Sequence, residues 1–165
     1  MNDSSGSAGR RRRFDSVEQE AYLQLWRTYD RLKALEDELF SAFDLSAQQY
    51  NALRLLRAVS PGTLPVNALG ERLISRAPDM TRLLDRLEAR GLVQRARRTD
   101  NRRVVEVGIT AGGIELLDQL SEPVRDCHRR QLGHLSDQSL RGLIELLEAS
   151  RAPHETPDGP WKTAT

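Results

Sequence analysis

The sequence contains few of the residues from which catalytic, metal-binding and disulfide-bonded sites are built. Its one cysteine, Cys127, excludes an intramolecular disulfide and fits a reducing compartment. The three histidines are His128, His134 and His154, and none has a thiol or a carboxylate at a recognised catalytic spacing. His128 and His134 are six residues apart, which places them on different faces of a helix rather than together as metal ligands. We therefore expect no enzymatic activity, no metal and no cofactor.

Long apolar runs are also missing. No segment approaches the roughly 18 consecutive apolar residues of a membrane-spanning helix, and the arginines near the N-terminus are not followed by the apolar stretch of a secretory signal. These absences predict a cytoplasmic protein that has no membrane contact. A chain of 165 residues suits one domain with its own core, and 38% hydrophobic with 30% charged residues fits a helix-rich protein.

Charge is distributed unevenly, although the formal net charge is only +1. Residues 1–13 carry about +3 and end in four consecutive arginines. Residues 69–110 contain ten arginines and six acidic residues, which gives about +4. This clustering predicts a localised face that binds an anionic partner.

Residues 66–91 have the pattern of two short helices joined by a turn. Apolar residues spaced three and four apart form one face of the first helix. They are Val66, Leu69 and Leu73. The turn that follows ends at Pro78, whose missing N–H suits the first turn of the second helix. Gly91 closes that helix, because glycine readily adopts the left-handed conformation found just past a helix end.

The second helix has two chemically distinct sides. Its apolar side carries Met80, Leu83, Leu84 and Leu87. The opposite stripe carries Asp79, Arg82 and Arg86, again three and four apart. Taken alone, an amphipathic helix with outward arginines is usually a solvated surface helix.

A strongly basic β-hairpin follows the second helix. Residues 92–95 and 104–107 have the composition of strands, and Asp100 and Asn101 are turn residues between them. A basic hairpin tip by itself usually serves solubility. The order of helix, turn, helix, glycine stop and basic hairpin within about 45 residues is much rarer by chance. It predicts a winged helix–turn–helix that binds duplex DNA.

A long helix over residues 17–43 is predicted from apolar residues that repeat at three and four. Since the mean helix has about 11–12 residues, part of this apolar surface is expected to pack on a second subunit. The helix holds five of the eight aromatic residues of the chain. They serve core and interface packing, or some of them form a pocket for a small aromatic or phenolic effector. The pocket residues on this second interpretation are Tyr22, Trp26, Tyr29 and Tyr50.

Three further helices are predicted. Ser46 and Gln49 form a capping box that opens a helix ending at residue 58. Thr110 caps a helix over residues 111–132, which Pro123 should kink or break near Ser121. The last helix starts after Ser136 and has an apolar face. That face consists of Leu140, Leu143, Ile144 and Leu147.

Several of these segments resemble the MarR family of bacterial transcription regulators. Residues 83–93, LLDRLEARGLV, are similar to the family's recognition-helix end and entry to the wing. Residues 102–105, RRVV, followed by Ile109-Thr110, resemble its wing return strand and the start of its next helix. The opening of the second helix at Ser46 is also similar. The resemblance covers roughly residues 17–151.

The resemblance implies a homodimer whose first and last helices interleave, with two winged domains on adjacent major grooves. It implies contacts to bases from Pro78, Asp79 and Arg82, and a minor-groove contact from Arg102. The chain departs from the family pattern at one point. Where the family usually has Asp directly before the wing arginine pair, this chain has Asn101, and Asp100 stands one residue earlier.

The predicted fold is mainly α with a small β-hairpin wing, a winged helix–turn–helix with long N- and C-terminal dimerisation helices. Residues 1–13 are expected to form a disordered basic arm, which is either a solubilising tail or a contact to the DNA backbone. Residues 14–45 and 111–150 form the helical dimerisation region, and residues 46–110 form the DNA-binding domain. Residues 151–165 are expected to be a flexible tail. Cys127 lies on an apolar helical stripe, as a core residue or a redox switch.

The expected DNA contacts differ in kind. Arginine forks on the second helix suit guanine O6 and N7, whereas wing arginines suit a narrow minor groove and helix N-terminal groups suit phosphate. The candidates are Arg76, Arg82 and Arg86 for bases, Arg102 and Arg103 for the minor groove, and Thr81 with the amides after Pro78 for phosphate. Asp79 either favours the helix dipole or orients Arg82.

The function follows from the expected DNA contacts and the expected dimer. A dimer presents two recognition helices about one DNA turn apart, so the operator should be an inverted repeat. Together with the resemblance, which implies a homodimer and repression, the sequence predicts a homodimeric DNA-binding repressor that is released by a small-molecule effector. The alternative is a winged-helix dimeric module that binds protein without specific DNA binding.

Overall fold

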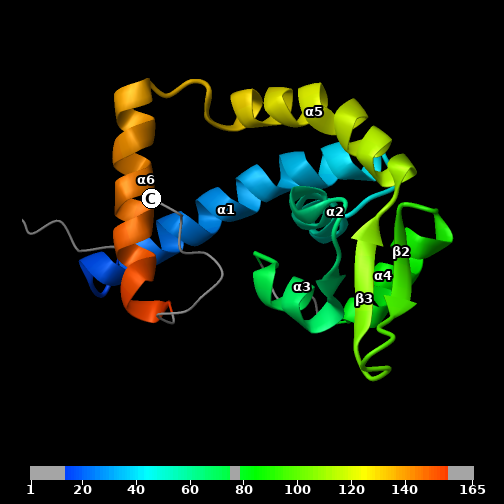
Figure 1. Cartoon of the computed structure of the whole chain (residues 1–165). Helices are drawn as coiled ribbons and strands as arrows, with labels where there is room; N and C mark the ends of the chain where they lie inside the picture. The colour runs from blue at the N-terminus through cyan, green and yellow to red at the C-terminus, as the bar shows by residue number, and fades with distance from the viewer. Residues whose placement is uncertain (1–13, 75–78, 156–165) are drawn as a thin grey trace, which may run out of the picture. The chain divides into compact units, whose positions relative to one another are not determined.

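The computed structural model describes residues 14–74 and 79–155 of the chain, and these are mainly helical (Figure 1). The predicted residues Arg76 and Pro78 lie outside the described residues, as do the N-terminal arm and most of the C-terminal tail. The chain divides into two compact units, one ending at Ala34 and one beginning at Leu35.

The first unit contains most of helix α1 (Val17–Ser41), which ends in the second unit. Its large side chains are exposed: Tyr22, Trp26 and Tyr29 have exposed fractions of 63%, 60% and 59%. The rings of Tyr22 and Trp26 contact each other with centroids 6.2 Å apart. The helix stops at Ser41, two residues before the predicted end at Phe43, because residues 42–44 turn and Asp44 has a φ of +54°.

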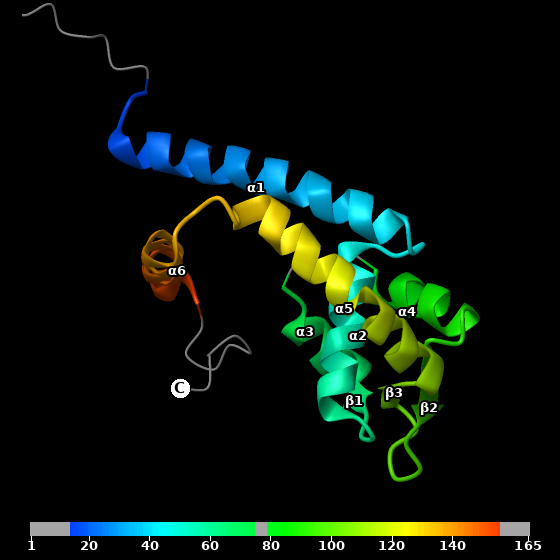
Figure 2. The ribbon, with the colours of Figure 1, turned by 90° about the horizontal axis from the view of Figure 1, so that it is seen from above.

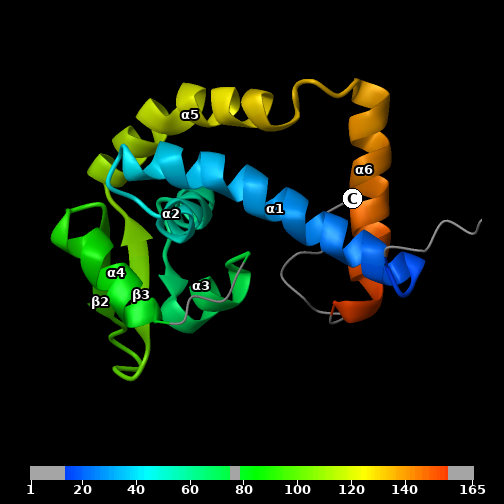
Figure 3. The same cartoon turned by 180° about the vertical axis from the view of Figure 1, so that it is seen from behind.

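The second unit holds the remaining helices and strands (Figures 2 and 3). In chain order they are α2 (Ala47–Val59), β1 (Leu64–Pro65), α3 (Val66–Arg72), α4 (Met80–Ala89), β2 (Val93–Arg97), β3 (Val105–Ile109), α5 (Ala111–Leu132), α6 (Asp137–Arg151) and the 3₁₀ turn η1 (Ala152–His154). The predicted capping box is confirmed, because Ser46 accepts from the amide of Gln49 and the Gln49 side chain accepts from the amide of Ser46.

Leucines from α2, α3, α4 and α5 form the core of this unit together with valines of the sheet. The largest fully buried side chains are Leu53, Leu56, Leu69, Leu84, Leu87, Leu120, Val93 and Val107. Each removes an apolar surface from water and so stabilises the fold by about 1.5–3 kcal/mol before the entropy of ordering is counted. This core fixes α3, α4 and the sheet as one body.

The sheet has three antiparallel strands in the order β1-β3-β2. Only the hairpin of β2 and β3 was expected from the sequence, and β1 was missed because two residues carry no strand pattern. Leu64 pairs with Val107, and Val93 pairs with Ile109 at the other edge of β3. The hairpin tip extends away from the helices (Figure 1).

Two glycines tie α4 and α5 to this sheet. Gly91 has a φ of +68°, and the amides of Gly91 and Leu92 donate to the carbonyls of Glu88 and Leu87, so the predicted left-handed helix stop is confirmed. Gly113 lies in the first turn of α5 against the base of the hairpin, where a Cβ would meet the carbonyl oxygen of Leu92 at 2.3 Å.

Two predictions for the C-terminal helices are wrong in detail. α5 continues through Pro123 as one helix, so the predicted alternative of a break near Ser121 does not occur. The tail was expected to begin at Arg151, but α6 includes this residue and η1 follows, where Arg151 pairs with Glu155. No residue of α6 is buried, and Ile144 and Leu146 are 53% and 69% exposed.

Candidate nucleic-acid interface

Helix α4 presents one apolar side to the core and one polar side to solvent. Leu83, Leu84 and Leu87 are buried, whereas Thr81, Arg82 and Arg86 are exposed. The alternation arises because the apolar residues recur at the helical spacing of three and four. The polar side of α4 is therefore accessible to a partner.

The start of α4 differs from the sequence prediction. Pro78 was expected in the first helical turn, but α4 begins at Met80 and Asp79 is its N-cap. Asp79 Oδ1 accepts a hydrogen bond from the backbone amide of Arg82 at 2.9 Å. Asp79 thus satisfies one of the four amides that every helix start leaves unpaired. This contact fixes the backbone from which Arg82 projects.

A shallow hollow of about 260 Å³ lies between the start of α2 and the polar side of α4. Asp79, Arg82 and Arg86 line it together with Ser46 and Gln48. The start of α2 was predicted only as a capping box, and no local pattern indicates that it borders the polar stripe of α4. The hollow brings side chains from two helices to one surface.

The wing tip is held by an ion pair that the sequence left unassigned. Asp100 accepts from Arg98 through two contacts, Nε to Oδ1 at 2.9 Å and Nη2 to Oδ2 at 2.7 Å. The Arg98 guanidinium lowers the pKa of Asp100 below its usual range, chiefly through these hydrogen bonds. Asp100, which stands one residue earlier than the Asp usual in the family, therefore pairs with Arg98. The amide side chain of Asn101 accepts from the backbone N–H of Arg103 at 3.1 Å and shapes the turn.

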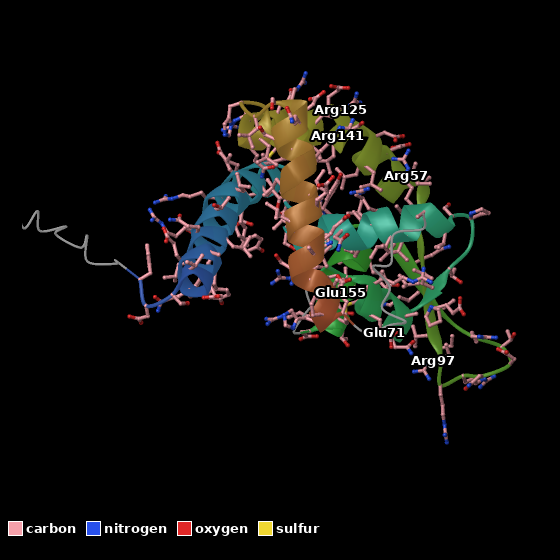
Figure 4. All side chains as sticks on the ribbon, turned by 90° about the vertical axis from the view of Figure 1, so that its left-hand side faces the viewer. Arg57, Glu71, Arg97, Arg125, Arg141 and Glu155 are labelled. Carbon is pink, nitrogen blue, oxygen red and sulfur yellow. The ribbon has the colours of Figure 1, made fainter. Side chains whose placement is uncertain are left out.

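Other arginines of the basic segment hold the fold together. Arg95 donates to Glu88 from Nε at 2.9 Å and from Nη2 at 2.5 Å, and its Nη2 also contacts Asp85 at 2.6 Å. Arg90 donates to backbone carbonyls in the turn that follows α1. Arg97, seen on the hairpin in Figure 4, donates to the carbonyl oxygen of Arg102 at 3.4 Å. These internal roles depend on the three-dimensional fold, so the sequence did not assign them.

The predicted contact arginines have a different environment. Within residues 14–74 and 79–155, no acidic side chain pairs with Arg82, Arg86, Arg102 or Arg103, and all four are exposed. An exposed guanidinium without an acidic partner keeps its five donors for an external acceptor. Two such groups lie on α4 and two on the wing tip.

A second hollow of about 650 Å³ lies between α2 and α5. Its lining combines apolar side chains, Leu117 and Val124, with the phenol of Tyr50, which stacks on Phe40. Burial raises the pKa of Tyr50. The remaining lining residues are Arg54, Arg57, Ala58, Ser121, Arg125 and His128. Of the four aromatic residues predicted for an effector pocket, Tyr50 lines this hollow, and Tyr22, Trp26 and Tyr29 belong to the first unit.

In the described part of the chain, no group of three His, Cys, Asp or Glu side chains is placed to hold a metal ion. Nor does any described helix combine the length and the apolar character needed to cross a membrane. Cys127 is buried on α5, and this burial raises the pKa of its thiol.

Comparison with known proteins agrees with this geometry. The profile of the MarR family matches residues 45–105. A MarR transcription factor from Planctomyces limnophilus is 60% identical, with a TM-score of 0.67 over 83% of this chain and 99% of that chain. The multiple antibiotic resistance protein MarR of Escherichia coli is 31% identical over 69% of this chain and 78% of its own length. A mutant of the E. coli MarR solved with operator DNA shares 24% identity and has a TM-score of 0.69, over 81% of this chain and 95% of that chain. The chain belongs to the MarR family of transcription regulators.

Proposed function

We propose that this MarR-family regulator binds an inverted-repeat operator as a homodimer, through α4 in the major groove and the β2–β3 wing in the minor groove. The observation that carries the proposal is the distribution of unpaired arginines. Arg82 and Arg86 project from the polar side of α4, and Arg102 and Arg103 project from the wing tip of the same body. Nearby arginines that would otherwise add the same charge are engaged within the fold.

The contacts divide between recognition and positioning. Arg82 and Arg86 have forked donors that suit guanine O6 and N7, and each such pairing discriminates between bases by about 1–3 kcal/mol. Arg102 and Arg103 would enter or follow a narrow A·T-rich minor groove, where the negative potential is strongest. Thr81 and the first amides of α4 would hold phosphate. Arg76 and Pro78 complete the proposed set, outside the described residues.

The partner in the dimer would be a second copy of this chain. The apolar residues of α6 have no core to enter, since none of that helix is buried, and Tyr22, Trp26 and Tyr29 of α1 are exposed. Apolar surface of this kind is removed from water when subunits associate. We assign residues 14–45 and 111–150 to dimerisation and residues 46–110 to DNA binding. The E. coli family member has been solved with operator DNA.

A small aromatic effector with an acidic group would regulate the protein from the hollow between α2 and α5. The volume of about 650 Å³ lies in the usual range for small-molecule sites, and the lining offers apolar walls with arginines at hand. Arg57, one of the lining residues, pairs with Asp118 of α5 at 2.8 Å. An effector that binds one spacing of the recognition helices more tightly than the other would release the operator, and this makes the protein a repressor.

Selection from a random duplex library tests the proposed function. The purified chain should enrich an inverted repeat, and raising the salt concentration should weaken binding steeply. Arg82→Ala should lose the enriched sequence. Arg141→Ala is the matched control, because it removes the same charge from the exposed surface of α6 (Figure 4). Size-exclusion chromatography should show that this variant remains a dimer, and it should keep the enriched sequence.

Two results would contradict the proposal. If no sequence is enriched, the chain would act as a dimeric module that binds protein. If Arg82→Ala and Arg141→Ala behave alike, base recognition by α4 would be wrong even though DNA binding stands. Thermal unfolding of both variants shows that any difference is not a folding defect.

A further inference from the structure

An acidic residue occupies the middle of the wing sheet. Glu106 lies on β3, the central strand, between Ala96 of β2 and Pro65 of β1. Its neighbour Val107 is fully buried, so the Glu106 side chain faces the opposite side of the sheet. That side chain is only 20% exposed. A carboxylate in this position needs partners.

The first partner comes from the loop that precedes β1. The hydroxyl of Thr63 donates a hydrogen bond to Oε2 of Glu106. Thr63 can lie over the strand because residue 108 is glycine: a Cβ there would meet Thr63 Cγ2 at 3.1 Å, closer than most side chains allow. The loop between α2 and β1 is thereby fastened to the outer side of β3.

The second partner comes from the wing tip. Arg98 Nη1 lies 3.8 Å from Oε1 of Glu106, and the same guanidinium donates twice to Asp100. The contacts run in series from Thr63 through Glu106 and Arg98 to Asp100. Backbone bonds close the tip beyond them, from Arg98 N–H to the carbonyl of Val104 at 3.1 Å. Besides the paired strands, the side chain of Glu106 thus links the tip to the loop that precedes β1.

We propose that Glu106 is a positioning residue for DNA binding, which holds the wing tip at the angle that directs Arg102 and Arg103 toward the minor groove. The inference rests on the proposed function. A negative charge in a DNA-binding domain repels phosphate, so on charge alone the domain would bind DNA more tightly without it. Removing a residue that positions the wing weakens DNA binding instead. The tip is then mobile in the free protein, and ordering it on binding costs conformational entropy.

Operator affinity of Glu106→Ala distinguishes these two effects by sign. We expect binding to the selected operator to weaken about tenfold, as for the loss of a charged hydrogen-bond partner. Glu71→Ala is the matched control, since it removes the same charge from exposed α3 in the same domain (Figure 4). That control should bind equally well or more tightly. Glu106→Gln keeps an acceptor for Thr63 and should lie between Glu106→Ala and the unsubstituted chain.

The threonine end of the series provides a conservative pair. Thr63→Val removes the hydroxyl and should weaken operator binding, whereas Thr63→Ser keeps the hydroxyl donor and should bind the operator as the unsubstituted chain does. Amide hydrogen exchange without DNA should be faster over residues 98–104 in Glu106→Ala and unchanged in Glu71→Ala. The exchange measurement reports on the wing itself, and equal melting temperatures would show that the rest of the domain is intact.

The outcomes separate the two proposals. If the unsubstituted chain binds no operator, both the proposed function and this role of Glu106 are wrong. If it binds and Glu106→Ala binds as tightly or more tightly, the positioning role alone is overturned. The same conclusion follows if exchange in the wing tip is unchanged by the substitution.

Discussion

Arg90 Nη1 donates a hydrogen bond to the carbonyl oxygen of Asp44 at 2.5 Å, and its Nη2 donates to the carbonyl of Phe43 at 3.1 Å. The two segments lie 46 and 47 residues apart in the chain. Arg90 is the C-cap of α4, and the carbonyls belong to the turn that follows α1. The end of the proposed recognition helix is therefore fastened to the turn that leads into α2.

Replacing Arg90 with Ala should lower the free energy of unfolding by about 1 kcal/mol, because two backbone carbonyls lose a charged donor. The melting temperature should fall by about 2–4 °C, measured by circular dichroism at fixed protein concentration. Arg86→Ala is the matched control on the same helix. Its guanidinium is exposed and has no acidic partner among the described residues, so the melting temperature should stay unchanged while operator binding weakens. Equal melting of the two variants would contradict the assignment.

The Glu88–Arg95 pair should make stability depend on acidity. Hydrogen bonds from Arg95 lower the pKa of Glu88, so the folded chain binds this proton less readily than the unfolded chain. The stabilisation is then fully present above the ordinary glutamate pKa and is lost as the pH falls through the lowered value. Glu88→Gln should melt below the unsubstituted chain at pH 7, and the gap should shrink as the pH is lowered through that window. A gap that stays constant with pH would exclude the ionised pair as its cause.

The order of secondary structure could be predicted from the sequence because residues at the ends of several helices indicate where those helices begin or stop. Ser46 with Gln49, Gly91 and Thr110 mark helix ends by chemistry that acts over three or four residues, and each was placed correctly. The start of α4 was placed too early, since Pro78 and Asp79 both carry start signals and the hydrogen bond of Asp79 decides between them. Strand β1 was missed because pairing with β3, and not its own composition, makes it a strand.

The division of labour among the arginines could not be predicted in the same way. All ten in the basic segment look alike in sequence, and some of the contacts that distinguish them join residues distant along the chain, as Arg90 and Asp44 do. Arg98 illustrates this difference, because Asp100 is nearby in sequence while Glu106 faces it only once β2 and β3 have paired. The apolar face of α6 was predicted correctly as a pattern, but one chain alone offers no partner that would bury it.

Substitutions of the wing residue Arg102 should separate the effect of its charge on operator binding from the effect of its planar guanidinium. Arg102→Ala should weaken operator binding and reduce the slope of log affinity against log salt by about one for each phosphate charge no longer neutralised. Arg102→Lys keeps the charge but loses the planar fork. It should keep the slope while losing affinity for sites with an A·T-rich minor groove, as measured by titration over several salt concentrations. If Arg102→Ala leaves both the affinity and the slope as in the unsubstituted chain, Arg102 does not contact the DNA.

Gly91 and Gly142 should respond to alanine with opposite signs, because only their backbone conformations differ. A Cβ at either position meets no atom within 4 Å, so crowding plays no part. Gly91 has a φ of +68°, which costs an L-residue about 1–2 kcal/mol, and Gly91→Ala should destabilise the protein by about that amount. Gly142 lies inside α6 with an ordinary helical backbone. Gly142→Ala should therefore stabilise the protein by about 0.5–1 kcal/mol. Denaturant unfolding of the two variants under identical conditions measures both changes, and a shift in the same direction for both would show that the left-handed turn at Gly91 does not govern its response.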